Sequence, residues 1–222
     1  MYTIYRHYRG MLYMCVGTAV HSESLEPHEV YRCLYDNEVG RTWVRPQAMF
    51  HEKIANGDDR FTPVGRFRRA APREEAEIIS FGFDVWGEGK TLQEYVAQSL
   101  AVGREQRAER FMFEGLDGRR LSKVNVLRFA DGLVGFASLA TRPQERGQGY
   151  GSIVLRAAME MARLENADTR FLLFSEVKPE IYERLGFHVL DDTVQRFKPS
   201  LAMATGSLPL SPDELVFLEN YF

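Results

Sequence analysis

Cysteine is scarce in this 222-residue sequence, which contains only Cys15 and Cys33. A fold built on several disulfides is therefore excluded. The two thiols could pair with each other, but nothing else in the sequence is typical of a secreted protein. We expect two free thiols in a reducing compartment, and neither stands in a context typical of a nucleophile.

Long apolar runs are also missing. No run approaches the roughly 18 residues that a membrane span requires, and no basic segment followed by an apolar one opens the chain. The formal net charge is only -3, which excludes an electrostatic attraction of the whole chain to nucleic acid or acidic lipid. We expect a soluble, cytoplasmic protein without a membrane partner.

Metal-ligand spacings, internal repeats and low-complexity tracts are absent as well. No grouping of His, Cys, Asp and Glu has the spacing of a metal site, so no metal cofactor is predicted. The hydrophobic content of 45% is typical of a globular protein. The sequence is long enough for one large domain or for a small domain joined to a medium one.

The composition changes along the chain. Residues 2–64 are rich in aromatic residues and short alternating runs, which predicts a small all-β unit. The segment 65–77, GRFRRAAPREEAE, combines arginines with acids. We expect a small β domain over 1–65, a linker over 66–76 and a second domain over 77–222. The linker could be a solvated hinge or could contact phosphate.

The second block alternates helix and strand patterns. Thr91 and Glu94 form a capping box before a helical pattern, and Asp131-Gly132 is a hairpin signal between two strands. From residue 152 onward, apolar residues recur on one helical face. They are Ile153, Val154, Ala157, Ala158, Met161 and Leu164. Strands then precede and follow a short helix at 178–186, so the fold class is α+β (mixed α/β), with a mixed central sheet flanked by helices.

A loop with three glycines, TRPQERGQGYGS at 141–152, lies between a predicted strand and this helix. Several residues without a Cβ suit a backbone that lets an anion approach its N–H groups. A P-loop is excluded because Ser152 and Ile153, with no lysine, follow the last glycine. The alternating glycines do not give the dinucleotide pattern G-x-G-x-x-G either. What remains is R-x-x-G-x-G, formed by Arg146, Gly149 and Gly151.

This pattern resembles the pyrophosphate loop of the GCN5-related N-acetyltransferases (GNAT family). A second motif of that family, Y-E-x-L-G-F, occurs about 30 residues later. It comprises Tyr182, Glu183, Leu185, Gly186 and Phe187. The two motifs in this order make the resemblance strong over residues 131–190, and it extends loosely upstream to about residue 76.

The resemblance implies that the protein binds acetyl-CoA. The backbone around the loop would hold the pyrophosphate, and the end of the preceding strand would pair with the pantetheine arm. The residues implied in coenzyme A binding are Leu139, Ala140, Thr141, Arg146, Gly147, Gln148, Gly149, Tyr150, Gly151 and Ser152. Ser175 could hydrogen-bond the cofactor or the substrate.

The resemblance also places Tyr182 as the general acid that protonates the departing thiolate. A phenol with a pKa near 10 suits a thiol whose pKa is near ~8.5. Tyr182 could instead only pack in its turn. Glu114 and Glu176 are candidates for the general base, but the surroundings of each in the sequence favour a surface or structural carboxylate.

The first block resembles a small domain of unknown function called DUF1653. The matching positions are Tyr5, His7, Tyr8, Gly10, His21, Ser22, Glu23, Val30, Tyr31, Arg32, Trp43, Val44, Arg45, Pro46, Met49 and Phe50. This resemblance implies a compact SH3-like β-barrel without an established chemistry. Its aromatic and arginine residues could bind a peptide or nucleic-acid ligand, or they could form the core of a small domain.

The combined hypothesis is a two-domain N-acetyltransferase that acetylates a primary amine of a small molecule, peptide or protein. An acyl-CoA-binding regulatory protein without turnover and a nucleic-acid-directed module remain alternatives. The tail contains a helix start at SPDEL, 211–215. It could dock on the core or on a second copy in a homodimer.

Overall fold

The computed structural model of the protein describes residues 1–129, 132–195 and 199–206. The expected turn residue Asp131 and the expected tail helix lie outside these ranges. The strands are β1 (Tyr2–His7), β2 (Leu12–Val20), β3 (Pro27–Cys33), β4 (Thr42–Pro46), β5 (Phe61–Arg69), β6 (Glu109–Glu114), β7 (Arg120–Arg128), β8 (Leu133–Thr141), β9 (Arg170–Ser175), β10 (His188–Val189) and β11 (Leu201–Ala204). The helices are α1 (Gln47–Phe50), α2 (Pro72–Ser80), α3 (Phe83–Trp86), α4 (Leu92–Glu105), α5 (Tyr150–Glu165) and α6 (Glu180–Glu183), with 3-10 turns at Pro143–Glu145 and Asp192–Val194.

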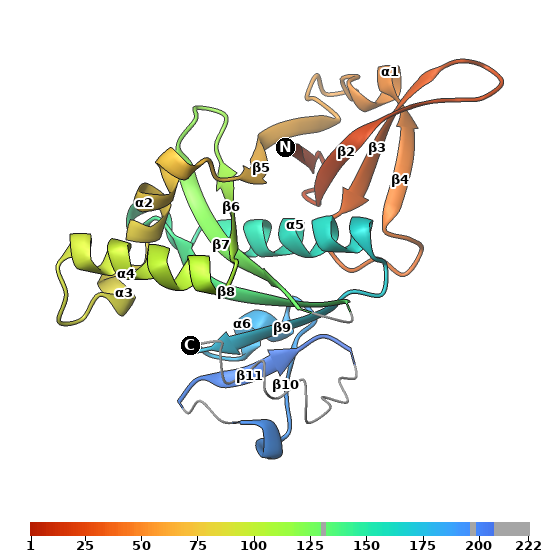
Figure 1. The fold of residues 1–222 in the computed structure, drawn as a ribbon. Coiled ribbons are helices and arrows are strands. Elements are labelled where there is room, and N and C mark those ends of the chain that lie inside the picture. Colours follow the sequence, from red (N-terminus) through yellow and green to blue (C-terminus); the bar gives the residue numbers. More distant parts are fainter. Residues whose placement is uncertain (130–131, 196–198, 207–222) are drawn as a thin grey trace.

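All the described strands belong to one continuous sheet with the order β10-β11-β9-β8-β7-β6-β5-β1-β2-β3-β4 (Figure 1). Neighbouring strands are antiparallel except β8 and β9, which are parallel. The mixed sheet predicted for the second block is therefore confirmed. The parallel pair is joined by α5, as a crossover connection requires.

The SH3-like barrel expected at the N-terminus is not confirmed. Strand β4 ends the sheet and, within the described residues, pairs only with β3, so these strands form an open meander. Their aromatic side chains form a core of their own. Tyr13, Tyr31, Phe50 and Phe61 are buried, and the rings of Phe50 and Phe61 stack at 4.1 Å. Tyr8 stays exposed.

The expected linker at 66–76 is not a linker in this structure. Its first residues belong to β5, which pairs with β1 on one side and β6 on the other, and its last residues belong to α2. The physical reason is that Phe67 alternates with arginines and is fully buried between the two parts of the sheet. Strand β5 therefore joins the N-terminal strands to the rest of the sheet.

Helices cover both faces of the C-terminal half of the sheet (Figure 1). Helix α5 packs its apolar face against β6, β7 and β8, and five of its predicted core residues are buried, namely Ile153, Val154, Ala157, Ala158 and Met161. The sixth, Leu164, is 41% exposed, which corrects the prediction. Helices α2 and α4 pack together on the opposite face.

Helix α4 begins as its sequence predicts. The Thr91 hydroxyl accepts a hydrogen bond from the Glu94 N–H, and the Glu94 carboxylate accepts one from the Thr91 N–H. This reciprocal capping satisfies donors that the first turn of a helix otherwise leaves without partners. Among the described residues, no helix is long and apolar enough to cross a membrane.

Candidate active site between the diverging strands

The candidate site begins where the two parallel strands separate. Residues Leu133–Phe136 of β8 pair with Arg170–Leu173 of β9, and beyond this point β8 continues to Thr141 without pairing with β9. The predicted pantetheine-pairing residues Leu139, Ala140 and Thr141 lie in this separated part. Their edge toward β9 is therefore free to pair with an extended ligand.

A β-bulge interrupts β8 at the point of separation. Lys123 of β7 faces Ala140, whereas Asn125 faces Ala137, so Ser138 and Leu139 together stand opposite Val124. Ser138 has a φ of 47°, an unusual value for a residue other than glycine. Such bulges redirect backbone and side chains and are common beside active sites.

The glycine loop lies between β8 and α5, in the position that the sequence predicts. Gly147 and Gly149 have φ values of 80° and 82°, which only glycine adopts without strain. The backbone N–H groups of residues 147–152 form no hydrogen bond with another described residue. Free N–H groups and the positive end of the α5 dipole together make a site for an anion.

The loop's side chains are held by other protein groups. Arg146 forms an ion pair with Asp84 at 2.6 Å and donates to the Phe81 carbonyl, so its charge is already compensated. This pairing holds the pKa of Asp84 below its usual value. Gln148 donates to Glu145 and accepts from Tyr150. An anion that binds at this loop would therefore contact mainly its backbone N–H groups.

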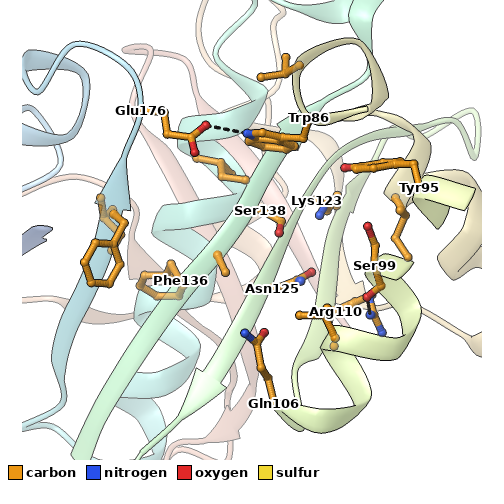
Figure 2. A pocket seen from close by; sticks show the side chains of 18 of the residues that line it. Trp86, Tyr95, Ser99, Gln106, Arg110, Lys123, Asn125, Phe136, Ser138 and Glu176 are labelled. Atoms are coloured by element: carbon orange, nitrogen blue, oxygen red, sulfur yellow. Dashed lines mark hydrogen bonds between the residues drawn. The ribbon is translucent and has the colours of Figure 1, made fainter. Parts of the chain in front are cut away.

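A cavity of about 490 Å³ opens beside the bulge, between the sheet and helix α4 (Figure 2). It is lined by residues of all the helices except α1, by β6, β7, β8 and β9, and by the segments before α4 and after β9. At its mouth the Trp86 indole donates a hydrogen bond of 2.7 Å to Glu176. This contact joins α3 to the segment that follows β9. The candidate base Glu176 thus lies at the cavity but is already bonded.

Tyr182 lines the same cavity from α6. Its hydroxyl forms no hydrogen bond with a described residue, while its ring packs edge-on against Phe187 at 6.2 Å. Burial and, secondarily, the nearby Glu176 carboxylate raise the pKa of Tyr182. The phenol therefore stays protonated at neutral pH, as a proton donor must.

Ser175 is occupied by its own turn. Its hydroxyl donates to the Val177 carbonyl at 2.7 Å and accepts from the Val177 N–H. It is buried at the end of β9 and is absent from the cavity wall among the described lining residues. The side chain shapes the strand end close to Glu176.

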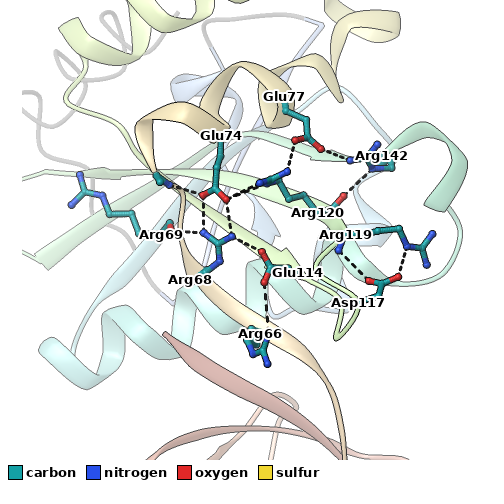
Figure 3. Close-up of polar contacts among 11 residues, drawn as sticks. Arg66, Arg68, Arg69, Glu74, Glu77, Glu114, Asp117, Arg119, Arg120 and Arg142 are labelled. Atoms are coloured by element: carbon teal, nitrogen blue, oxygen red, sulfur yellow. Dashed lines mark hydrogen bonds and ion pairs between the residues drawn. The ribbon is translucent and has the colours of Figure 1, made fainter.

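Glu114, the other candidate base, is not among the residues that line the cavity. It pairs with Arg68 and Arg66 in an ion network that joins β5, β6, β7 and α2 (Figure 3). In the same network Glu74 accepts from Arg68 at 2.7 Å and from Arg120 at 2.9 Å. Three arginines of the expected linker, Arg66, Arg68 and Arg69, are thus paired with carboxylates. Glu114 has a structural position.

The cavity floor contains three polar residues that the sequence did not single out: Arg110 of β6, and Lys123 and Asn125 of β7 (Figure 2). All three are buried. In sequence, Lys123 and Asn125 alternate with apolar residues, which is equally typical of a solvent-facing strand face. Only the helices above this face show that it borders a cavity. No group of three or more His, Cys, Asp or Glu residues in the described ranges could hold a metal ion.

Comparisons with known proteins match the N-terminal and C-terminal parts of the chain to two different family models. Residues 3–69 match a family model described as a protein of unknown function (DUF1653), and residues 108–189 match a model described as an acetyltransferase (GNAT) domain. No curated protein matches the sequence significantly.

Solved structures with a similar fold cover about two thirds of this chain. Ard1 from Thermoplasma volcanium is 16% identical with a TM-score of 0.51, over 65% of this chain and 99% of that one. The GNAT family N-acetyltransferase YhbS from Escherichia coli, in complex with CoA, is 16% identical with a TM-score of 0.50, over 68% and 84%. A spermidine N-acetyltransferase SpeG chimera from Vibrio cholerae and hSSAT is 14% identical with a TM-score of 0.50, over 64% and 94%. At these identities the likeness shows the fold.

Proposed function

We propose that this chain, whose residues 108–189 match the model of an acetyltransferase (GNAT) domain, transfers the acetyl group of acetyl-CoA to a primary amine. The observation that carries the proposal is the arrangement of the separated strands. The part of β8 that does not pair with β9 lines the cavity that contains Tyr182, and the glycine loop follows directly at the end of this strand. An extended thioester with a phosphate-rich end fits such a path.

The loop and strand edge would bind the cofactor. The N–H groups of residues 147–152 would hold the pyrophosphate, and Leu139, Ala140 and Thr141 would pair with the pantetheine arm. The cofactor supplies the acetyl thioester, whose carbonyl carbon forms a C–N bond with the amine while its C–S bond breaks and the electron pair leaves with sulfur. The side chain of Arg146 would hold the loop in place through Asp84.

Tyr182 would donate its proton to the departing sulfur. Its hydroxyl is free of protein partners and its raised pKa keeps it protonated until that moment. The attacking amine must lose a proton when the C–N bond forms, and this proton would leave to a group in the cavity or to solvent. Trp86 and Glu176, bonded to each other, would limit the access of water at the mouth.

Acetyl-CoA binding and turnover test the proposal separately. We expect acetyl-CoA at about 100 times its Kd to raise the Tm by roughly 5–10 °C, and a panel of primary amines to release free CoA thiol. No rise in Tm would overturn the cofactor assignment. A rise without thiol release from any amine would favour the acyl-CoA-binding regulatory protein.

A further inference from the structure

The floor of the cavity presents a row of polar side chains. In the strand register Arg110 of β6 faces Asn125 of β7, which faces Ala137 of β8, and Lys123 lies two residues before Asn125. Side chains two residues apart project from the same face of a strand. Arg110, Asn125 and Lys123 therefore point together into the cavity beside the Ser138 bulge (Figure 2).

These polar groups have unused hydrogen-bonding capacity. Arg110 Nε and Asn125 Oδ1 are buried and have no hydrogen-bond partner in the described part of the chain. Lys123 is only 2% exposed, and its ammonium likewise forms no hydrogen bond with a described residue. Leaving buried polar groups unpaired is costly, and such groups are usually explained by a ligand or by ordered water.

The charges around the floor leave Lys123 uncompensated. Arg110 is partly neutralised, since its Nη1 donates to Glu75 of α2 at 3.0 Å and its Nη2 donates to the Ser99 carbonyl of α4 at 3.1 Å. The charged residues of the cavity wall are Lys90, Arg110, Lys123 and Glu176. The one carboxylate among them, Glu176, lies at the mouth and is bonded to Trp86. The floor therefore complements an anion.

The protonation of Lys123 reflects this shortage of negative charge. Burial and the nearby Arg110 guanidinium lower the pKa of Lys123 to about 7. An anion placed beside the amine would raise this pKa again, because an opposite charge favours the charged form. Binding of a carboxylate and protonation of Lys123 would thus reinforce each other.

We propose that the acceptor is a primary amine that carries a carboxylate, as an α-amino acid does. Its carboxylate accepts hydrogen bonds from Lys123 and from Arg110 Nε, and its amine donates to Asn125 Oδ1. The amine nitrogen then lies beside the bulge, where β8 leaves β9. This inference rests on the proposed function and names its substrate class. A cavity of about 490 Å³ falls in the size range of small-molecule sites, roughly 300–1,000 Å³.

Matched pairs of acceptors test the carboxylate directly. Each pair joins an α-amino acid to the amine left after decarboxylation, such as tyrosine with tyramine and lysine with cadaverine, and spermidine is added as a cationic acceptor. Binding is measured by calorimetry with CoA present, and turnover by thiol release from acetyl-CoA. We expect the amino acid to bind about 10- to 100-fold more tightly than its partner amine.

Substitutions in the cavity test whether its floor causes the tighter binding of the amino acid. In Lys123→Met the ratio between the Kd of the decarboxylated amine and the Kd of the amino acid should fall to near one. Lys90→Met changes an exposed lysine of the cavity wall and should leave this ratio unchanged. Asn125→Asp provides a second test, because its carboxylate would repel the amino acid and leave the decarboxylated amine bound. Equal binding within the pairs, a preference for spermidine, or an undiminished advantage in Lys123→Met would overturn the inference. Failure of acetyl-CoA to bind would count against the proposed function. The affinities of each amino acid and its decarboxylated amine would still decide whether the cavity binds a carboxylate.

Discussion

Arg32 of β3 and Glu160 of α5 form a buried ion pair, with Nη2 and Oε2 2.6 Å apart. They are 128 residues apart in sequence. The same carboxylate also accepts from Arg41 at 3.0 Å and from Arg163 at 2.7 Å. The two segments that match separate family models are therefore connected by buried polar contacts as well as through β5.

Replacement of Glu160 by alanine tests how strongly this contact couples the two segments. The change leaves the buried Arg32 and the partly buried Arg163 without their carboxylate, so we expect the free energy of unfolding to fall by about 3–5 kcal/mol. Urea denaturation followed by circular dichroism measures the loss. Glu165 lies on the same helix as Glu160, and its exposed side chain pairs with Arg128 of β7. Glu165→Ala should therefore lower the free energy of unfolding by at most about 1 kcal/mol. Similar losses in the two variants would contradict the coupling.

Local sequence patterns predicted the elements that depend on neighbouring residues. The capping box at Thr91, the buried face of α5 and the glycine loop are determined within a few residues, and all three are present where they were expected. In contrast, the arginines at 66–69 looked like a hinge because their partners are remote. Arg68 pairs with Glu74 and with Glu114, which is 46 residues away.

The candidate site was predictable only in part for the same reason. The loop and Tyr182 belong to short motifs, so they could be identified from sequence. The cavity floor combines β6 with β7 under α4, and the alternation around Lys123 cannot distinguish a strand face covered by a helix from one facing water. Its identification required the tertiary arrangement.

The glycine loop gives a second prediction. Gly149 has a φ of 82°, so Gly149→Val would strain the backbone and displace the N–H groups before α5. We expect the variant to lose the rise in Tm on addition of acetyl-CoA. Gly118→Val is the matched control, since Gly118 has a φ of 80° but lies in the turn between β6 and β7. A full rise in the Gly149 variant would refute the role of the loop.

The role of Tyr182 is tested by a change of one atom. Tyr182→Phe keeps the ring and its contact with Phe187 but removes the hydroxyl. We expect kcat to fall by about 10²–10⁴-fold, the usual contribution of a general acid, while the acetyl-CoA-induced rise in Tm stays unchanged. Thiol release under saturating acetyl-CoA provides the measurement. Undiminished turnover would exclude the hydroxyl from the proton transfer.

Acid should weaken the network around Glu74. Hydrogen bonds from Arg68, the Ala71 N–H and Arg120 hold the pKa of Glu74 well below its usual value. A carboxylate with a depressed pKa stabilises the fold above its unfolded value of about 4.5, and this stabilisation is lost as the pH falls below it. Glu74→Gln should therefore be less stable than the wild-type protein at pH 7, and the difference should shrink toward pH 3. Urea unfolding at several pH values measures it, with the exposed Glu183→Gln as a control that changes little.

Lys123, in contrast to Glu74, should lower the stability of the fold at pH 7. Its pKa is about 7 in the folded protein against 10.5 for an ordinary lysine. Between these values the unfolded chain binds the extra proton, so the free energy of unfolding rises with pH from about 7 to about 10.5, and the cost of burying the amine is greatest at and below pH 7.

Lys123→Met removes this cost without leaving a large void. We expect the variant to be more stable than the wild-type protein by a few kcal/mol, on the order given by the pKa shift, at pH 7, with the gain fading toward pH 10. Chemical denaturation at pH 6 to 10 follows the difference. A destabilised variant at pH 7 would show that the buried amine has a favourable partner in the native state. A stabilised variant that has lost its preference for carboxylates would show that the protein retains a costly buried lysine for binding its acceptor.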